Sequence, residues 1–180
     1  MRWSRARSLS SFVQGRDSMT KICDGIWKAI SHFGRKIVQA CLTASRFGNI
    51  NVIVVDQIFI TCTGSMLDEI CEDQVGAPWI LAESCSKDVI ASTENCVHRA
   101  VYQATSAGAI IHTHSPYAVA ISLLDGGSIE PVDGEGLYFL GPMPIVAGGF
   151  GTEELAKNVS SALTNHRACV AWGHGSLPQV

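Results

Sequence analysis

Short apolar runs with strand character alternate along this chain with segments of helical period. The strand-like runs are residues 50–55, 57–61, 87–90, 108–114 and 168–172. The segments with helical character are residues 19–45, 94–104, 116–124 and 152–166. Because strands and helices interleave, the sequence predicts an α/β fold in which helices cover both faces of a sheet.

Length and composition limit the classes of protein that this chain can belong to. Its 180 residues, 47% of them apolar, are enough to bury one sizeable core, so we predict one main domain. The formal net charge of −3 gives no electrostatic signature of nucleic-acid binding. No apolar run approaches the length that spans a bilayer. We therefore expect neither nucleic acid nor membrane as a partner.

The cysteines indicate a reducing compartment. The chain has seven of them, an odd number, and none forms a C-x-x-C pair. This pattern argues against a disulfide framework and against a zinc ribbon. We therefore expect free thiols that act as small apolar residues, and a cytoplasmic protein.

The first eighteen residues differ from the rest of the chain. They contain Arg2, Arg5, Arg7 and Arg16 among serines, and no acidic residue precedes Asp17. A transit peptide has this composition but also forms an amphipathic helix, which is not evident here. We interpret residues 1–18 as a disordered extension and 19–180 as the folded domain.

The run 108–114 ends in two histidines, His112 and His114, separated by one residue. In a strand, positions i and i+2 lie on the same face, so both imidazoles can reach one metal ion. Further along, His174 lies between two glycines, and upstream Glu94 falls in the first turn of a predicted helix. Three imidazoles that leave a fourth position open form the usual ligand set of catalytic zinc. We predict a metal site at these histidines, with Glu94 as a fourth ligand or a general base.

The other histidines are not assigned to this site. His32, His98 and His166 each fit a helical pattern, where a histidine is more often a surface or packing residue. The prediction of a metal site depends on the combination of His112, His114 and His174, since each of them alone also fits a turn or a packed position.

Small polar residues lie at the ends of several predicted elements. They are Gly48, Asn49, Thr63, Gly64, Ser92 and Thr93. Hydroxyls, an amide and backbone N–H groups that meet at the start of a helix can hold a phosphate without a lysine. Each pair alone is ordinary turn chemistry. Their combination predicts an anion-binding site.

Several motifs in a fixed order give the chain a family resemblance. They lie at residues 48–50, 60–64, 92–94, 109–118, 150–163 and 174–175. In these motifs the chain resembles the class II aldolase/adducin-head family, most closely its fuculose-phosphate aldolase branch. The resemblance spans residues 30–176, which is nearly the whole predicted domain.

The resemblance implies a fold, an assembly and a set of site residues. The implied fold is a three-layer α/β/α sandwich with a mixed, largely antiparallel central sheet, and the implied assembly is a homotetramer. His112, His114 and His174 correspond to the zinc ligands, and Glu94 to the acidic catalytic residue and resting-state ligand. The sugar phosphate would bind at the six polar residues Gly48, Asn49, Thr63, Gly64, Ser92 and Thr93.

The same resemblance implies a reaction. It is the zinc-dependent cleavage of a ketose 1-phosphate, with L-fuculose 1-phosphate as the first candidate, into dihydroxyacetone phosphate and L-lactaldehyde. Glutamate at position 94 favours the aldolase branch over the epimerases, which have aspartate there. A sugar-phosphate dehydratase, an epimerase and a catalytically silent, adducin-like interaction domain remain alternatives.

The chain also departs from the family pattern. It ends six residues after His174, where family members continue into a helical segment that contributes tyrosines to a neighbouring subunit. We therefore expect a domain truncated at its C-terminus, with its assembly and the proton donor to the aldehyde left open. A second family tyrosine has no counterpart near residues 131–136, where Asp133 or Glu135 either contributes or forms a surface turn. Asn51 stands where a serine is usual.

Overall fold

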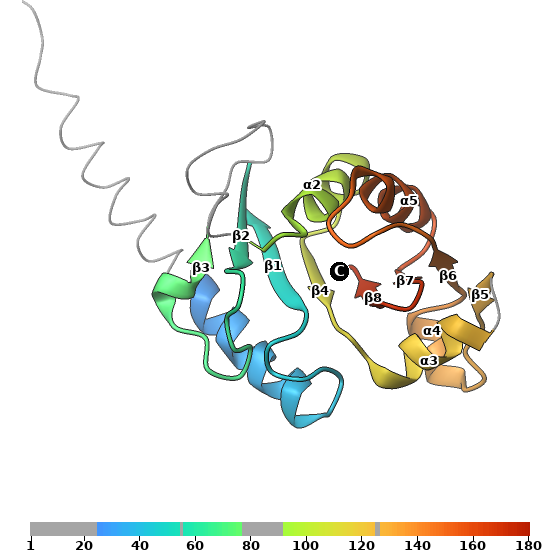
Figure 1. The fold of residues 1–180 in the computed structure, drawn as a ribbon, viewed down its shortest axis with the longest axis horizontal. Helices are drawn as coiled ribbons and strands as arrows, with labels where there is room; N and C mark the ends of the chain where they lie inside the picture. The colour runs from blue at the N-terminus through green and yellow to red at the C-terminus, as the bar shows by residue number, and fades with distance from the viewer. Residues whose placement is uncertain (1–24, 55, 77–91, 125–126) are drawn as a thin grey trace, which may run out of the picture.

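The computed structural model describes residues 25–54, 56–76, 92–124 and 127–180. The strands of these ranges are β1 (Asn49–Val54), β2 (Gln57–Thr61), β3 (Val75–Gly76), β4 (Ala109–His112), β5 (Ser128–Ile129), β6 (Met143–Val146), β7 (Ala168–Ala171) and β8 (Gly175–Pro178). They form two four-stranded sheets, in the orders β3-β2-β1-β4 and β5-β6-β7-β8 (Figure 1). Neighbouring strands are antiparallel except β6 and β7, which are parallel.

Backbone hydrogen bonds join the two sheets along β4 and β8. The N–H of Thr113 donates to the carbonyl of Ser176 at 3.1 Å, and the reverse bond is 2.8 Å long. At the other end, the N–H of Gly108 donates to the carbonyl of Val180 at 2.6 Å. We call this line of contact the β4–β8 seam. The strands thus form one mixed, largely antiparallel sheet, which confirms the predicted sheet type.

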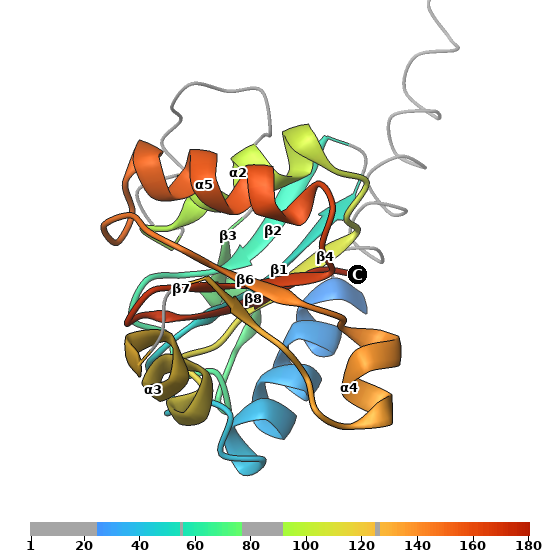
Figure 2. The same ribbon diagram turned by 90° about the vertical axis from the view of Figure 1, so that its right-hand side faces the viewer.

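Helices cover both faces of this sheet. The helices α2 (Asn95–Ala104) and α5 (Glu153–Leu163) lie side by side on one face. The helix of residues 25–39, α3 (Pro116–Leu124) and α4 (Gly134–Phe139) lie on the other face (Figure 2). The three-layer α/β/α sandwich is therefore confirmed. None of the helices in the described part of the chain is long and apolar enough to cross a membrane.

The alternating side chains of β2 show how the core divides between the two faces. Ile58 and Ile60, both fully buried, pack into the cluster that includes Val97 of α2 and Leu155 of α5. Between them, Phe59 points the opposite way and joins Ile30 and its neighbours in a second cluster. This strand is apolar on both faces because helices cover both of them.

The first helix ends earlier than its apolar pattern predicts. It stops at residue 39 rather than near Ser45, because Cys41 takes a left-handed conformation with φ of 56°. The N–H of Leu42 donates to the carbonyl of Ile37, and that of Cys41 to Val38, which is the bond pattern of a Schellman motif. Cys41 therefore lies beyond the helix and is exposed, as is Phe33, at 49%.

Other boundaries also differ from the sequence analysis. The run 168–172 is not the last strand, because β8 follows it, and the elements β5, β6 and α4 were missed. The sequence Gly-Ser-Leu-Pro of β8 has no β-branched or aromatic residue, so it gives no local strand signal. The helix expected over residues 152–166 ends at Leu163. The predicted strand 87–90 and the extension 1–18 lie outside the described residues.

Candidate metal and phosphate site

The structure brings the three predicted histidines together at the end of β4. His112 is the last residue of β4, opposite Asn49 of β1, and His114 follows two residues later. From across the seam, His174 approaches on the turn between β7 and β8. One ring nitrogen from each histidine lies within 4.8 Å of the others. Ring centroids are 4.7 to 4.8 Å apart.

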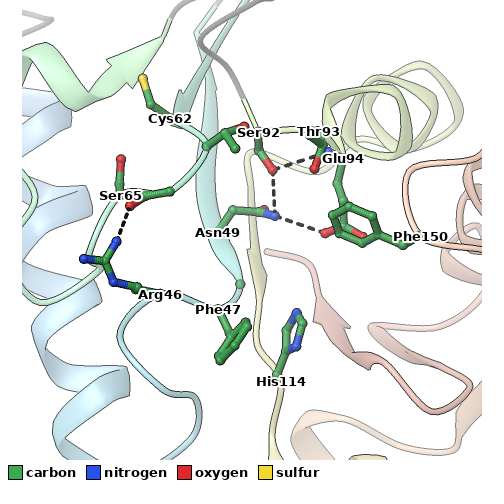
Figure 3. A pocket seen from close by; sticks show the side chains of 13 residues that line it. Arg46, Phe47, Asn49, Cys62, Ser65, Ser92, Thr93, Glu94, His114 and Phe150 are labelled. Atoms are coloured by element: carbon green, nitrogen blue, oxygen red, sulfur yellow. Dashed lines mark hydrogen bonds between the residues drawn. The ribbon is translucent and has the colours of Figure 1, made fainter.

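Glu94 closes the cluster from the side of α2. It is the N-cap residue of α2 rather than a first-turn residue, and its side chain makes no capping bond. Instead the carboxylate, 2% exposed, lies with Oε2 at 3.2 Å from Nε2 of His112 and Oε1 at 3.7 Å from Nδ1 of His174. The amide of Asn49 donates to Glu94 Oε2 at 3.1 Å and to the Ser92 hydroxyl at 3.2 Å (Figure 3). Asn49 thereby fixes the orientation of the carboxylate.

Hydrogen bonding sets the tautomer of His112. Its Nδ1 lies 3.1 Å from the carbonyl oxygen of Ser176, which can only accept, so Nδ1 carries the proton. The unprotonated Nε2 then faces the carboxylate oxygen of Glu94. Two lone pairs at this distance repel each other unless a proton or a metal cation lies between them. This arrangement of His112 and Glu94 suits a bound cation.

Other buried nitrogens of the cluster also lack hydrogen-bond partners. Among the described residues, nothing hydrogen-bonds to Nε2 of His112 or to either ring nitrogen of His174. Buried polar atoms are rarely left unsatisfied, and a metal ion satisfies imidazole nitrogens directly. The donor set of three imidazoles and one carboxylate therefore fits a divalent metal such as zinc.

Burial keeps His112 and His114 neutral. It lowers the pKa of His112 to about 3, with a smaller contribution from His174. Burial likewise lowers the pKa of His114 to about 4, aided by His112 and His174. Neutral imidazole is the form that binds a metal. Burial raises the pKa of Glu94, against the opposing effects of His174 and of the hydrogen bond from Asn49.

A polar cavity of about 130 Å³ adjoins the histidines. All six residues predicted to hold a phosphate line it, namely Gly48, Asn49, Thr63, Gly64, Ser92 and Thr93. They come from the turn before β1, the turn after β2 and the segment before α2. Glu94 and His114 line the same cavity, so the two predicted half-sites share one space (Figure 3).

Gly48 shows how closely the two half-sites approach. Its φ is +86°, and a Cβ atom there would lie 2.3 Å from the carbonyl oxygen of His112. A side chain at this position is therefore excluded both by backbone conformation and by lack of space.

The sequence analysis missed further residues that line the cavity. They are Arg46, Phe47, Cys62, Ser65 and Phe150. Arg46 donates from Nη1 to the carbonyl of Gly64 at 3.3 Å. Two exposed rings flank the cluster: Phe47 stacks on His114 with centroids 5.5 Å apart, and Phe150 meets His174 edge-on at 5.4 Å. The position of Arg46 and Phe47, directly before Gly48, was the available sequence signal.

Asp133 and Glu135, the two acidic residues considered near residues 131–136, do not belong to the site. Asp133 caps α4 by accepting from the N–H of Gly136 at 2.7 Å, and neither it nor Glu135 lines the cavity. His98, left out as a packing residue, is indeed fully buried on α2.

Comparison with known proteins identifies the family that this fold and site represent. Residues 28–177 match the family described as the class II aldolase and adducin N-terminal domain, and the chain belongs to it. The L-fuculose phosphate aldolase of Escherichia coli (strain K12) is 28% identical over 164 residues, covering 79% of this chain and 70% of that protein. The crystal structure of L-fuculose-1-phosphate aldolase from Thermus thermophilus has a TM-score of 0.79 at 30% identity, covering 85% of this chain and 77% of that one. These matches confirm the resemblance.

A second kind of relative covers less of the chain. A Nocardia farcinica (strain IFM 10152) protein, described as a probable bifunctional methylthioribose-1-phosphate isomerase and methylthioribulose-1-phosphate dehydratase, is 34% identical over 87 residues. The match covers 46% of this chain and 15% of that protein.

Proposed function

We propose that this chain is a zinc-dependent aldolase that cleaves a ketose 1-phosphate. The observation that carries the proposal is the buried histidine cluster, with unpartnered nitrogens, beside a cavity of small polar residues. Relatives named L-fuculose phosphate aldolase support L-fuculose 1-phosphate as the first substrate to test. Its products would be dihydroxyacetone phosphate and L-lactaldehyde.

His112, His114 and His174 would hold the zinc ion, with Glu94 as a further ligand when substrate is absent. When bound, the ion supplies Lewis-acid chemistry that stabilises negative charge on the three-carbon fragment. The protein keeps His112 and His114 neutral by burial, which lowers their pKa values, and orients His112 through its bond to Ser176. Orientation of this kind by a second residue is typical of metal-binding histidines.

Glu94 would move the proton of the reaction. When the C3–C4 bond breaks, its electron pair stays with the three-carbon fragment, and the C4 hydroxyl gives its proton to solvent water as the aldehyde forms. Glu94 then delivers a proton to C3, and in the reverse direction its carboxylate removes it. Burial raises the pKa of Glu94, which favours the protonated form that can donate.

The polar cavity would bind the phosphate group. Hydroxyls of Thr63, Ser92 and Thr93 and the backbone at the start of α2 supply donors for an anion. Arg46 lies on the same wall and adds a positive charge that the sequence analysis did not consider. Arginine is well suited to phosphate oxygens because its N–H groups form a fixed fork.

The test is release of dihydroxyacetone phosphate from L-fuculose 1-phosphate, with and without a metal chelator. We expect release that the chelator stops and added zinc restores. Release that persists after complete metal removal would exclude metal dependence. No release from this or any of a panel of ketose 1-phosphates would exclude the aldolase.

The relative from Nocardia favours a sugar-phosphate dehydratase as the second candidate. A dehydratase would eliminate water from methylthioribulose 1-phosphate and would form no dihydroxyacetone phosphate. Incubation of that substrate, followed by mass spectrometry for a loss of one water, separates the two reactions.

We also propose a cytoplasmic homotetramer. Free thiols are expected in a reducing compartment, and Cys41, Cys62, Cys71, Cys96 and Cys169 are unpaired. Large apolar side chains of α3 and α4 are exposed, including Tyr117 at 84% and Tyr138 at 76%. Exposed apolar surface of this kind supports an interface between subunits. Sedimentation velocity of the purified chain measures the assembly.

A further inference from the structure

His174 differs from His112 because it lies on a turn and not on a strand. The turn spans residues 172–174 between β7 and β8, and Gly173 takes a φ of +63°. Backbone bonds close the turn itself, from the N–H of His174 to the carbonyl of Ala171 at 3.0 Å. Turns are generally less restrained than paired strands, so contacts from outside decide how well this histidine is fixed.

Ser122 of α3 supplies such a contact. Its hydroxyl accepts a hydrogen bond from the N–H of Gly173 at 3.0 Å and donates to the carbonyl of Val119 at 2.7 Å. Since Val119 takes the single hydroxyl proton, a lone pair of the Ser122 oxygen is left to receive Gly173. The two bonds together leave the hydroxyl no freedom to rotate.

The burial of Ser122 is unusual for its helix. At 1% exposure it is the buried residue of α3, whereas Tyr117 and Leu124 on the same helix are 84% and 83% exposed. A serine hydroxyl in such a place loses its contact with water and requires partners within the protein. One of these partners is the N–H of Gly173, in the turn that carries His174.

We infer that Ser122 is a positioning residue for the metal site, acting through Gly173 on His174. The inference rests on the proposed function, because it assumes that these histidines bind a metal ion. His112 does not need this help, since strand pairing and the Ser176 carbonyl hold it. Ser122 therefore restrains a ligand that strand pairing does not hold.

Replacing Ser122 by alanine removes the acceptor and loosens the turn at Gly173, although the bonds from Trp172 to Val146 and from His174 to Ala171 remain. The turn must then be ordered when the metal binds, and this cost weakens binding. Loss of a residue that orients a metal ligand typically lowers metal affinity about 10- to 100-fold. We expect a loss of this size for zinc in Ser122→Ala.

The experiment measures zinc dissociation constants by competition with a chromophoric chelator, for wild type, Ser122→Ala and a matched control. Ser160→Ala is the control, because Ser160 donates to the carbonyl three residues earlier, as Ser122 does, but on an exposed helix face. We expect unchanged affinity for the control. Unfolding of the metal-free proteins is measured in parallel, since a merely structural serine would lower stability without changing the affinity of the folded protein.

Two further measurements keep the result decisive. Ser122→Thr retains the acceptor oxygen and should bind zinc nearly as wild type does. The visible spectrum of the cobalt-substituted protein should change in Ser122→Ala, because the geometry of one ligand changes. Equal zinc affinity in wild type and Ser122→Ala, or an equal loss in the threonine variant, would overturn the role of Ser122 alone. A wild-type protein that binds no zinc would overturn the proposed function as well.

Discussion

The two halves of the site are built differently. The histidine half consists of His112 at the end of β4, His114 after it and His174 on the β7–β8 turn, closed by Glu94. His112 and Glu94 are buried, and among the described residues Nε2 of His112 and both ring nitrogens of His174 lack hydrogen-bond partners. The polar half consists of the turn before β1, the turn after β2 and the segment before α2. Backbone groups and hydroxyls of these segments surround a cavity, and Arg46 is exposed. The histidine half is therefore suited to bind a cation, and the polar half to bind an anion.

This difference indicates how the work of the site is divided. Buried groups in a low-dielectric surrounding interact strongly with a charge, whereas exposed groups are screened by water. Changes in the histidine half should therefore abolish function, and changes at the rim of the polar half should only weaken binding.

The largest effect is expected for His112→Ala. It removes the ligand that the sheet holds most firmly, so zinc binding should be lost and aldolase activity should fall at least about 1,000-fold. Metal analysis and initial rates measure this. Inorganic phosphate should still bind to the metal-free variant. If the variant retains both zinc and activity, His112 is not a ligand. His32→Ala is the control, because His32 is exposed on the first helix.

The next effect is expected for Glu94→Gln. It keeps the shape of the side chain but removes the group that carries the proton, so kcat should fall about 100- to 10,000-fold. KM should change little, because the phosphate cavity is intact. Steady-state kinetics separate the two constants. Unchanged kcat would exclude Glu94 as the proton carrier.

A smaller effect is expected in the polar half for Arg46→Ala. Loss of one charge-assisted hydrogen bond at an exposed position should raise the KM for the sugar phosphate about tenfold, with kcat nearly unchanged. Arg35→Ala is the matched control, since Arg35 lies on the first helix and bonds only Ser31 among the described residues. An equal effect of both variants would mean that net charge, rather than the position of Arg46, matters.

The last prediction concerns the pH dependence of the free energy of unfolding, to which the buried His98 of α2 contributes. Burial lowers the pKa of His98 to about 3 from 6.5. Below pH 6.5 the unfolded chain therefore binds a proton that the folded chain does not, and stability falls with pH down to about 3. His98→Leu should remove up to about 1.4 kcal/mol per pH unit of this dependence. Urea unfolding of the metal-free proteins at pH 7 and pH 5 measures it; identical dependence in both proteins would contradict it.

Local patterns were sufficient for much of the fold. The helical segment 116–124 corresponds to α3, and the runs 50–55 and 57–61 correspond within one residue to β1 and β2. Both are decided within a few residues of chain. The Schellman end of the first helix was missed because a cysteine, rather than a glycine, adopts the left-handed conformation there.

The missed features depend on contacts between distant residues. Strand β8 exists because β7 and the seam pair with it, although its own residues have low strand propensity. The bond from Gly173 to Ser122 joins residues 51 positions apart, and no local pattern marks that serine. For the site, the motifs correctly indicated which histidines and polar residues would meet. Arg46 and Phe47 became evident only from the shape of the cavity.

The β4–β8 seam has a consequence for folding. β4, which carries His112 and leads to His114, belongs to one four-stranded sheet, and β7 and β8, whose turn carries His174, belong to the other, so the proposed metal ligands assemble only after the two sheets have joined. An ion bound there acts as a cross-link between two folding units and adds stability by mass action, about 2.7 kcal/mol at a concentration 100 times the dissociation constant. Metal loading would then report that both halves of the sheet have closed, and a nascent chain could not acquire the ion before β7 and β8 have joined β4.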